Sequence, residues 1–170
     1  TLASRIAVMD QGHIRQFAPP AEVYEDPADL FVAGFMGSPP MNMLDGRVEV
    51  GDGVHVVVEG GGETIHFPAP AAQRDRIAAY AGQSVILGLR PETIGAAGHE
   101  RGGAERFGFV REVEVVEPTG PDTLLVFSLG GVEATARVRP EDEPPVGTPF
   151  RFDVDMAKAK VFDPASGQRI

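Results

Sequence analysis

Two stretches in the C-terminal third of the chain alternate between apolar and polar side chains at every second position. Residues 132–138 place Val, Ala, Ala and Val at the even positions, and residues 150–156 place Phe, Phe, Val and Met there, with polar side chains between. Successive side chains of a strand point to opposite faces, so a period of two predicts strands with one buried and one solvated face.

Further short apolar segments, separated by glycine and proline turns, extend this pattern toward the middle of the chain. They are residues 48–50, 54–58, 85–87 and 109–117. One helix is expected from about Pro70 to Ala81, and the stretch 95–103 is expected to be a loop. Many short antiparallel strands with one helix indicate a mainly β fold, and a small OB-like barrel is its simplest closure.

The first 37 residues follow a different pattern, which predicts a β-hairpin and two helices. Residues 6–9 and 13–17 are expected to pair through a turn at Gly12, and a short helix is expected over 21–25. Asp26 is a good N-cap for a second helix, with Pro27 at its first position. That helix is apolar around most of its circumference, so we expect it to be buried.

A Pro-rich stretch separates these elements from the strands. We expect a first part over 1–37, a linker over 38–44 and a barrel domain over 45–170. The first part has too few strands to cover its own apolar residues, which indicates the end of a larger domain. Five of them are expected to bury against the barrel or a second chain: Ile6, Val8, Ile14, Phe17 and Phe31.

The amino-acid composition excludes several classes of function. The formal net charge is -10, with 15 basic against 25 acidic residues, so binding to nucleic acid through a basic surface is not expected. There are 0 cysteines, which excludes disulfides, cysteine-zinc sites and thiol chemistry. No apolar run is long enough to cross a bilayer, and the first residues do not have the pattern of a signal peptide.

A set of short motifs runs in order along nearly the whole chain. The motifs are Thr1 to Ile14, Pro20 to Tyr24, Pro27-Ala28, Phe31 to Pro39, Met41-Asn42, Gly88-Leu89-Arg90-Pro91-Glu92, Val115 to Gly120, Val161-Phe162-Asp163 and Gly167 to Ile170. Together they resemble the C-terminal part of the ATP-binding subunit of bacterial ABC importers of the maltose (MalK) and glycerol-phosphate type.

The resemblance implies that residues 1–37 are the end of an α/β ATPase domain and that 45–170 form an OB-like, transport-associated regulatory domain. Such domains pair with the same domain of a second subunit. The resemblance also implies membrane permease partners reached through the ATPase domain, a regulatory protein as a further partner, and a cytoplasmic location on the inner face of the plasma membrane. The transported solute, a sugar or a related compound, is chosen by other subunits.

The resemblance transfers no catalytic residue to this chain. ATP hydrolysis in the family needs a phosphate-binding loop of the form G-x-x-x-x-G-K-[ST], and no Gly-Lys pair occurs here. The magnesium-binding Asp, the catalytic Glu, the signature loop and the switch His would precede Thr1. We therefore expect no catalytic, cofactor or metal residues in this chain, whereas the full-length parent would be an ATPase that uses ATP and Mg.

Two motifs are candidates for regulatory or inter-domain contacts. Arg90, Pro91 and Glu92 follow a strand and would contact the ATPase domain or a partner subunit; alternatively they form a local turn, with Arg90 paired to a carboxylate. Phe162 and Asp163 lie in the terminal strand and could make a regulatory contact. Alternatively, Phe162 is a core residue and Asp163 begins a turn.

Other patterns have simpler explanations than a site. Ser128-Leu129-Gly130-Gly131 resembles an ABC signature but is expected to be a hairpin turn, and Asp153 and Asp155 lie on a solvated strand face. Two alternative functions remain: a barrel that senses a small oxyanion or solute, and an oligonucleotide-binding OB domain. The second needs exposed stacking aromatics over a basic groove, and the chain has no Trp and only two Tyr.

Overall fold

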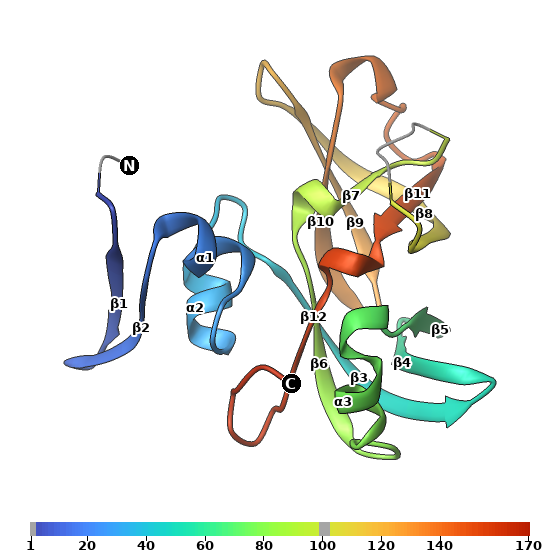
Figure 1. Ribbon diagram of the computed structural model, residues 1–170. Helices are drawn as coiled ribbons and strands as arrows, with labels where there is room; N and C mark the ends of the chain where they lie inside the picture. Colours follow the sequence, from blue (N-terminus) through green and yellow to red (C-terminus); the bar gives the residue numbers. More distant parts are fainter. Residues whose placement is uncertain (1–2, 99–102) are drawn as a thin grey trace.

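The structure is a computed structural model that describes residues 3–98 and 103–170. Its N-terminal part consists of the hairpin β1 (Ile6–Asp10) and β2 (His13–Ala18), followed by the helices α1 (Pro20–Glu25) and α2 (Leu30–Phe35). Figure 1 shows this part, in blue, beside a larger β unit. No helix of the described residues is long and apolar enough to cross a membrane.

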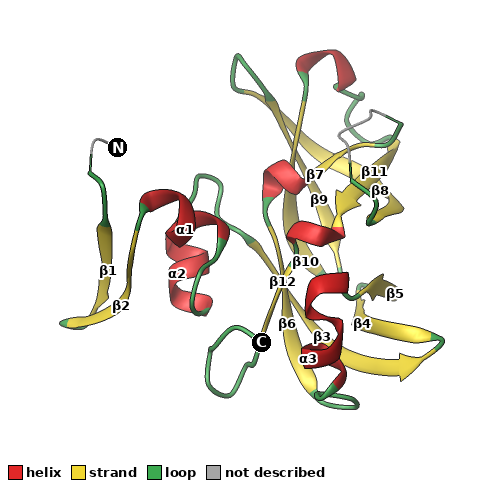
Figure 2. Cartoon of the chain, viewed as in Figure 1, coloured by secondary structure: helices red, strands yellow, loops and turns green. Residues whose placement is uncertain are grey.

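The larger unit, here called the barrel, contains two five-stranded antiparallel sheets. The first has the order β12-β6-β3-β4-β5 and the second the order β10-β9-β8-β11-β7. The strands are β3 (Asn42–Gly51), β4 (Gly53–Gly60), β5 (Glu63–Pro68), β6 (Ser84–Leu89), β7 (Ile94–Ala96), β8 (Arg106–Pro118), β9 (Thr123–Leu129), β10 (Val132–Val138), β11 (Pro149–Asp155) and β12 (Lys160–Phe162). Figure 2 shows how strands dominate the chain, which confirms the mainly β prediction.

Short helices connect the strands of the barrel. They are the helix α3 (Arg74–Ala78) and the 3-10 turns η1 (Ala71–Gln73), η2 (Pro91–Thr93), η3 (Pro140–Asp142) and η4 (Met156–Lys158). The helix expected over 70–81 is therefore shorter than predicted. Its end tightens because the N–H of Tyr80 bonds to the carbonyl of Ile77, three residues back, before Gly82 takes a φ of 75°.

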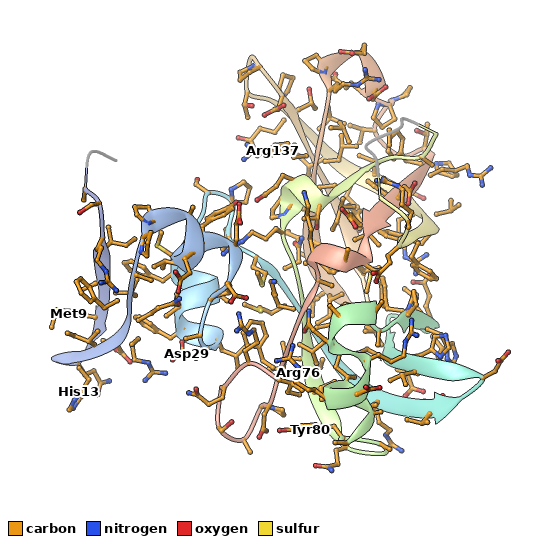
Figure 3. All side chains as sticks on the ribbon, viewed as in Figure 1. Met9, His13, Asp29, Arg76, Tyr80 and Arg137 are labelled. Carbon is orange, nitrogen blue, oxygen red and sulfur yellow. The ribbon has the colours of Figure 1, made fainter. Side chains whose placement is uncertain are left out.

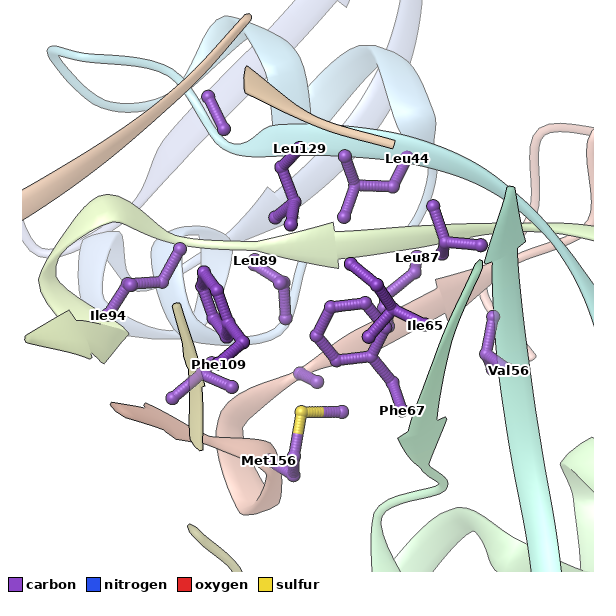
Figure 4. Close-up of a cluster of buried hydrophobic side chains, with 14 of the residues drawn as sticks. Leu44, Val56, Ile65, Phe67, Leu87, Leu89, Ile94, Phe109, Leu129 and Met156 are labelled. Atoms are coloured by element: carbon purple, nitrogen blue, oxygen red, sulfur yellow. The ribbon is translucent and has the colours of Figure 1, made fainter. Parts of the chain in front are cut away.

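Both sheets contribute to one core. Figure 4 shows Leu44, Phe67 and Leu87 of the first sheet facing Phe109 and Leu129 of the second. Aromatic rings stack at its centre, where the ring centroids of Phe127 and Phe152 lie 4.2 Å apart. The even positions of 150–156 are buried or half-buried as predicted, whereas Val132, next to a turn, is 45% exposed.

The predicted start of the second helix is wrong. Asp29, not Asp26, is the N-cap of α2, and its side chain accepts a hydrogen bond from the N–H of Val32 at 2.9 Å. Asp26 instead ends α1, because its own N–H bonds to the carbonyl of Glu22 at 2.8 Å. Residues 26–29 are not helical, so α2 begins three residues later than expected.

The apolar residues of the N-terminal part form a small cluster of their own. Val8, Val23 and Val32 are buried in it, with Ile6 and Phe31 packed against them. The expected burial against the barrel is wrong, because Ile6, Val8 and Phe31 pack within this N-terminal cluster and the helices lie between the hairpin and the barrel (Figure 1). Burial against a second chain stays a prediction. Ile14 and Phe17 are 62% and 54% exposed, and in α2, expected to be buried, Phe35 is 65% exposed.

The loop expected over 95–103 is shorter than predicted. Gly95 and Ala96 belong to β7 and pair with Asp153 and Phe152 of β11. Residues 99–102 lie outside the described residues, so the central part of that prediction stays untested. The Ser128 to Gly131 motif forms the turn between β9 and β10, as expected.

Candidate functional site

Arg90 joins the barrel to the helical segment, defined here as α1, α2 and the residues between them. It follows β6 directly and is only 4% exposed. Its Nη1 donates to the carbonyl of Met36 at 2.6 Å, and its Nη2 donates to the carbonyl of Tyr24 at 2.7 Å. These carbonyls lie at the C-terminal ends of the two helices, where no N–H of the helix remains to bond them. One guanidinium therefore satisfies both helix ends.

Tyr24 is held by two residues of the Arg-Pro-Glu motif. The guanidinium carbon of Arg90 lies 3.9 Å from the centroid of the Tyr24 ring, which is a cation-π contact. The Tyr24 hydroxyl donates to Oε1 of Glu92. Pro91, which is buried, begins the η2 turn between these two residues. The turn therefore presents Arg90 and Glu92 to the same tyrosine, and we call this set of side chains the junction.

Burial shifts the pKa values of the Arg90 guanidinium and of the Tyr24 hydroxyl. Burial lowers the pKa of Arg90, and the neighbouring Tyr24 and Glu92 oppose that shift. Burial also raises the pKa of Tyr24, and the hydrogen bond to the Glu92 carboxylate raises it further. A guanidinium stays charged at neutral pH, and the tyrosine stays protonated, so the junction is intact there.

Phe162 and Asp163 lie at a second contact with the helical segment. Phe162 is fully buried and packs with Ala33 of α2 and with Met41. Gly88 allows this close packing, because a Cβ there would lie 2.4 Å from the Met41 sulfur. Asp163 forms a turn in which its side chain accepts from the N–H of Ala165 at 2.8 Å.

The C-terminal tail, residues 163–170, was not identified by the sequence analysis as a contact with the helices. The N–H of Leu30 bonds to the carbonyl of Gly167 at 2.9 Å, and the N–H of Arg169 bonds to the carbonyl of Ala28 at 3.1 Å. The Arg169 side chain pairs with Asp26. Backbone hydrogen bonds of this kind have no sequence signature. The one signal in the sequence is the apolar Ile170, which is buried and so indicates that the tail packs against the chain.

The expected linker also contains a structural residue. Asn42 is the first residue of β3, and its Nδ2 donates to the carbonyls of Leu89 and Thr135, each at 2.9 Å. Its Oδ1 accepts from the N–H of Thr135 at 2.8 Å. Asn42 thus ties β6 of one sheet to β10 of the other.

A cavity of about 370 Å³ opens beside the junction. Its lining residues come from the helical segment and from three parts of the barrel: Tyr24, Glu25, Met41, Arg90, Glu92, Thr93, Ala157, Lys158 and Lys160. Elsewhere, Asp153 is paired with Arg106 at 2.7 Å. No cluster of three potential metal-ligating side chains occurs within residues 3–98 and 103–170.

Two domain families match the barrel. The MalK OB fold domain matches residues 37–94, and the TOBE domain matches residues 87–162. Arg90 to Ile94 lie where the two matches overlap.

Curated relatives match the chain over its full length. The sulfoquinovosyl glycerol transport ATP-binding protein SmoE of Agrobacterium fabrum is 37% identical over 172 residues. The sn-glycerol-3-phosphate import ATP-binding protein UgpC of Escherichia coli K12 is 35% identical over 170 residues. In both cases the alignment covers 100% of this chain and 44% of the relative. The chain therefore spans less than half of the length of the curated relatives it matches.

A solved structure shares the fold of the barrel. It is a crystal structure of the cytoplasmic molybdate-binding protein ModG, with a TM-score of 0.50 and 16% sequence identity, and the match covers 71% of this chain and 94% of that chain. At this identity the likeness concerns the fold alone. With its MalK OB fold and TOBE domains and its relatives among importer ATP-binding proteins, the chain belongs to the MalK-type family.

Proposed function

We propose that this chain is the regulatory and dimerising region of the ATP-binding subunit of a bacterial ABC importer for sugars or related solutes. The observation that carries the proposal is the full-length match to import ATP-binding proteins, which includes the helical segment as well as the two barrel domains. In this proposal residues 1–37 are the end of the ATPase domain, and the barrel from residue 45 onward pairs with the barrel of a second copy.

Hydrolysis belongs to the remainder of the parent subunit in this proposal. The chain has no Gly-Lys pair and therefore no phosphate-binding loop of the usual form. ATP and Mg would bind the parent's ATPase domain, which would also contact the permease subunits at the cytoplasmic face of the membrane. The barrel would act as a support that holds two subunits together and offers a surface to a regulatory protein.

The junction links the helical segment physically to the barrel, which supports a regulatory role for the barrel. Because Arg90 bonds the C-terminal ends of both helices, a rotation of the helical segment would be transmitted to the barrel through a buried side chain as well as through the connecting backbone. A coupled movement of this kind is what a regulatory domain needs in order to sense the state of an ATPase domain.

Light scattering after gel filtration tests the dimer in this proposal. Across a dilution series, the expected mass is twice the 18.0 kDa of the single chain. A mass of 18.0 kDa at every concentration would contradict autonomous dimerisation.

Calorimetry with MgATP tests the second half of the proposal. The chain alone is expected to show neither heat of binding nor release of phosphate. Saturable binding of MgATP to the chain would contradict the assignment of nucleotide chemistry to the rest of the parent.

A further inference from the structure

The cavity beside the junction gathers cations in a chain that is otherwise acidic. The chain has a net charge of -10, and its only two lysines are Lys158 and Lys160. Both line this cavity, together with Arg90. They reach it from η4 and β12, whereas Glu25 reaches it from the end of α1. The fold therefore brings both lysines to a single cavity between two parts of the chain.

The lysines keep hydrogen-bond donors free for a ligand. Lys158 makes no hydrogen bond or ion pair with the described part of the chain and is exposed at the cavity rim. The Lys160 Nζ lies 3.6 Å from Asp26 Oδ1, which is too long for a hydrogen bond, and its side chain is 17% exposed. An ammonium group has three donors, so neither lysine is saturated. Burial lowers the pKa of Lys160, which means that its charge lacks full solvation.

The cations left free at the cavity favour a phosphate group over a carboxylate as the bound anion. Arginine is the residue that binds planar carboxylates with two parallel bonds, and the fork of Arg90 is already used by the carbonyls of Tyr24 and Met36. Lysines act as point charges, and a phosphate monoester offers a charge of about -2 with three acceptor oxygens.

The remaining walls of the cavity suit a small hydroxylated body. The Tyr24 ring and Met41 provide apolar surface, and the carboxylates of Glu25 and Glu92 provide acceptors for hydroxyl groups. Ligand pockets in proteins have volumes of roughly 300–1,000 Å³. At about 370 Å³ this cavity lies at the small end of that range.

We propose that this cavity binds a small phosphorylated polyol, with its phosphate between Lys158 and Lys160 and its hydroxyl groups toward Glu25. The ligand would then touch the helical segment and the barrel at once and would stabilise their contact by mass action. The proposal concerns residues of this chain alone. It does not depend on the importer assignment, so a monomeric mass in light scattering leaves it standing.

Isothermal titration of the full chain with three probes tests the proposal. The probes are glycerol 3-phosphate, inorganic phosphate and glycerol. Glycerol 3-phosphate is expected to bind with a 1:1 stoichiometry, inorganic phosphate more weakly, and glycerol not at all. The absence of saturable binding of glycerol 3-phosphate up to about 10 mM would overturn the proposal. Equal affinity for inorganic phosphate and the ester would overturn the assignment to a polyol ester.

Variants test where the ligand binds. Because each lysine would donate a charge-assisted hydrogen bond to the phosphate, the double variant Lys158→Gln/Lys160→Gln is expected to bind at least about tenfold more weakly. The single variant Lys158→Gln, at an exposed residue, keeps the test independent of folding and is expected to weaken binding in the same direction. The matched control Arg47→Gln/Arg151→Gln removes two charges outside this cavity. Unchanged affinity in the lysine variants, or an equal loss in the control, would overturn the site.

Discussion

Arg90 and Tyr24 are joined twice, once through the backbone and once through the ring. Nη2 of Arg90 donates to the Tyr24 carbonyl at 2.7 Å, while the guanidinium carbon lies 3.9 Å from the Tyr24 ring centroid. These residues are 66 positions apart in sequence. A single side chain at the end of β6 therefore fixes both the end of α1 and the orientation of its aromatic ring.

Replacing Arg90 by Met is expected to destabilise the chain by about 3 kcal/mol, because two partly buried carbonyls lose charge-assisted donors. Urea unfolding followed by circular dichroism measures the change. Arg90→Lys is expected to recover only part of the loss, since an ammonium group cannot reproduce the planar fork. Arg151→Met, at an exposed strand position, is the matched control and is expected to be close to wild type. A loss below about 0.5 kcal/mol for Arg90→Met would contradict the role of the junction.

We expect the folded chain to lose stability at alkaline pH because of the Tyr24 hydroxyl. Burial and Glu92 raise the pKa of Tyr24 above its ordinary 10.0, so the folded chain holds this proton more tightly than the unfolded chain. The stabilisation is complete below pH 10 and is lost as the pH rises through the higher pKa of the folded state. Tyr24→Phe is expected to remove this part of the alkaline slope and to cost about 1 kcal/mol at pH 7.

The control for this experiment is Tyr80→Phe, which removes the only other tyrosine hydroxyl of the chain. Since that variant keeps the pair of Tyr24 and Glu92, it is expected to keep their alkaline slope. Thermal melting between pH 7 and pH 11 gives the comparison. Identical pH profiles for Tyr24→Phe and the wild type would contradict the proposed linkage.

Gly60 is expected to tolerate no side chain. A Cβ at this position would lie 2.1 Å from the carbonyl oxygen of Gly130, so Gly60→Ala would push the β4–β5 turn away from the β9–β10 turn. We expect a loss of about 2 kcal/mol in urea unfolding. Gly51→Ala is the matched control, because a Cβ at Gly51 has no neighbour within 4 Å. Equal stabilities of the two variants would show that the turns are not in contact.

The strands could be predicted from the sequence where one face of a sheet is buried. Residues 132–138 and 150–156 alternate because solvent and core demand different side chains on the two faces, and both stretches form strands, the second as far as Asp155. The second helix was misplaced because Asp26 and Asp29 are equally good N-caps in sequence. Only the structure shows that the amide of Asp26 is already bonded to Glu22.

The candidate site could be predicted only in part. The sequence pointed to Arg90 and Glu92, but their partners could not be found, because a carbonyl such as that of Met36 has no residue-specific signal. The cavity could not be predicted from the sequence, for a different reason. Lys158 and Lys160 meet Glu25 only after more than 130 intervening residues have folded, so no local pattern records their proximity.

The distance between a label on the helical segment and a label on the barrel shows whether the junction makes these two parts of the chain one rigid unit. The chain has no cysteine, so spin labels can be placed at Glu22→Cys on α1 and Asp52→Cys on the barrel, both exposed positions (Figure 3 shows the side chains of the chain). Pulsed electron paramagnetic resonance is expected to give one narrow distance in the wild-type background and a broad distribution with Arg90→Met. A broad distribution in the wild-type background, or an unchanged narrow one in Arg90→Met, would contradict the claim.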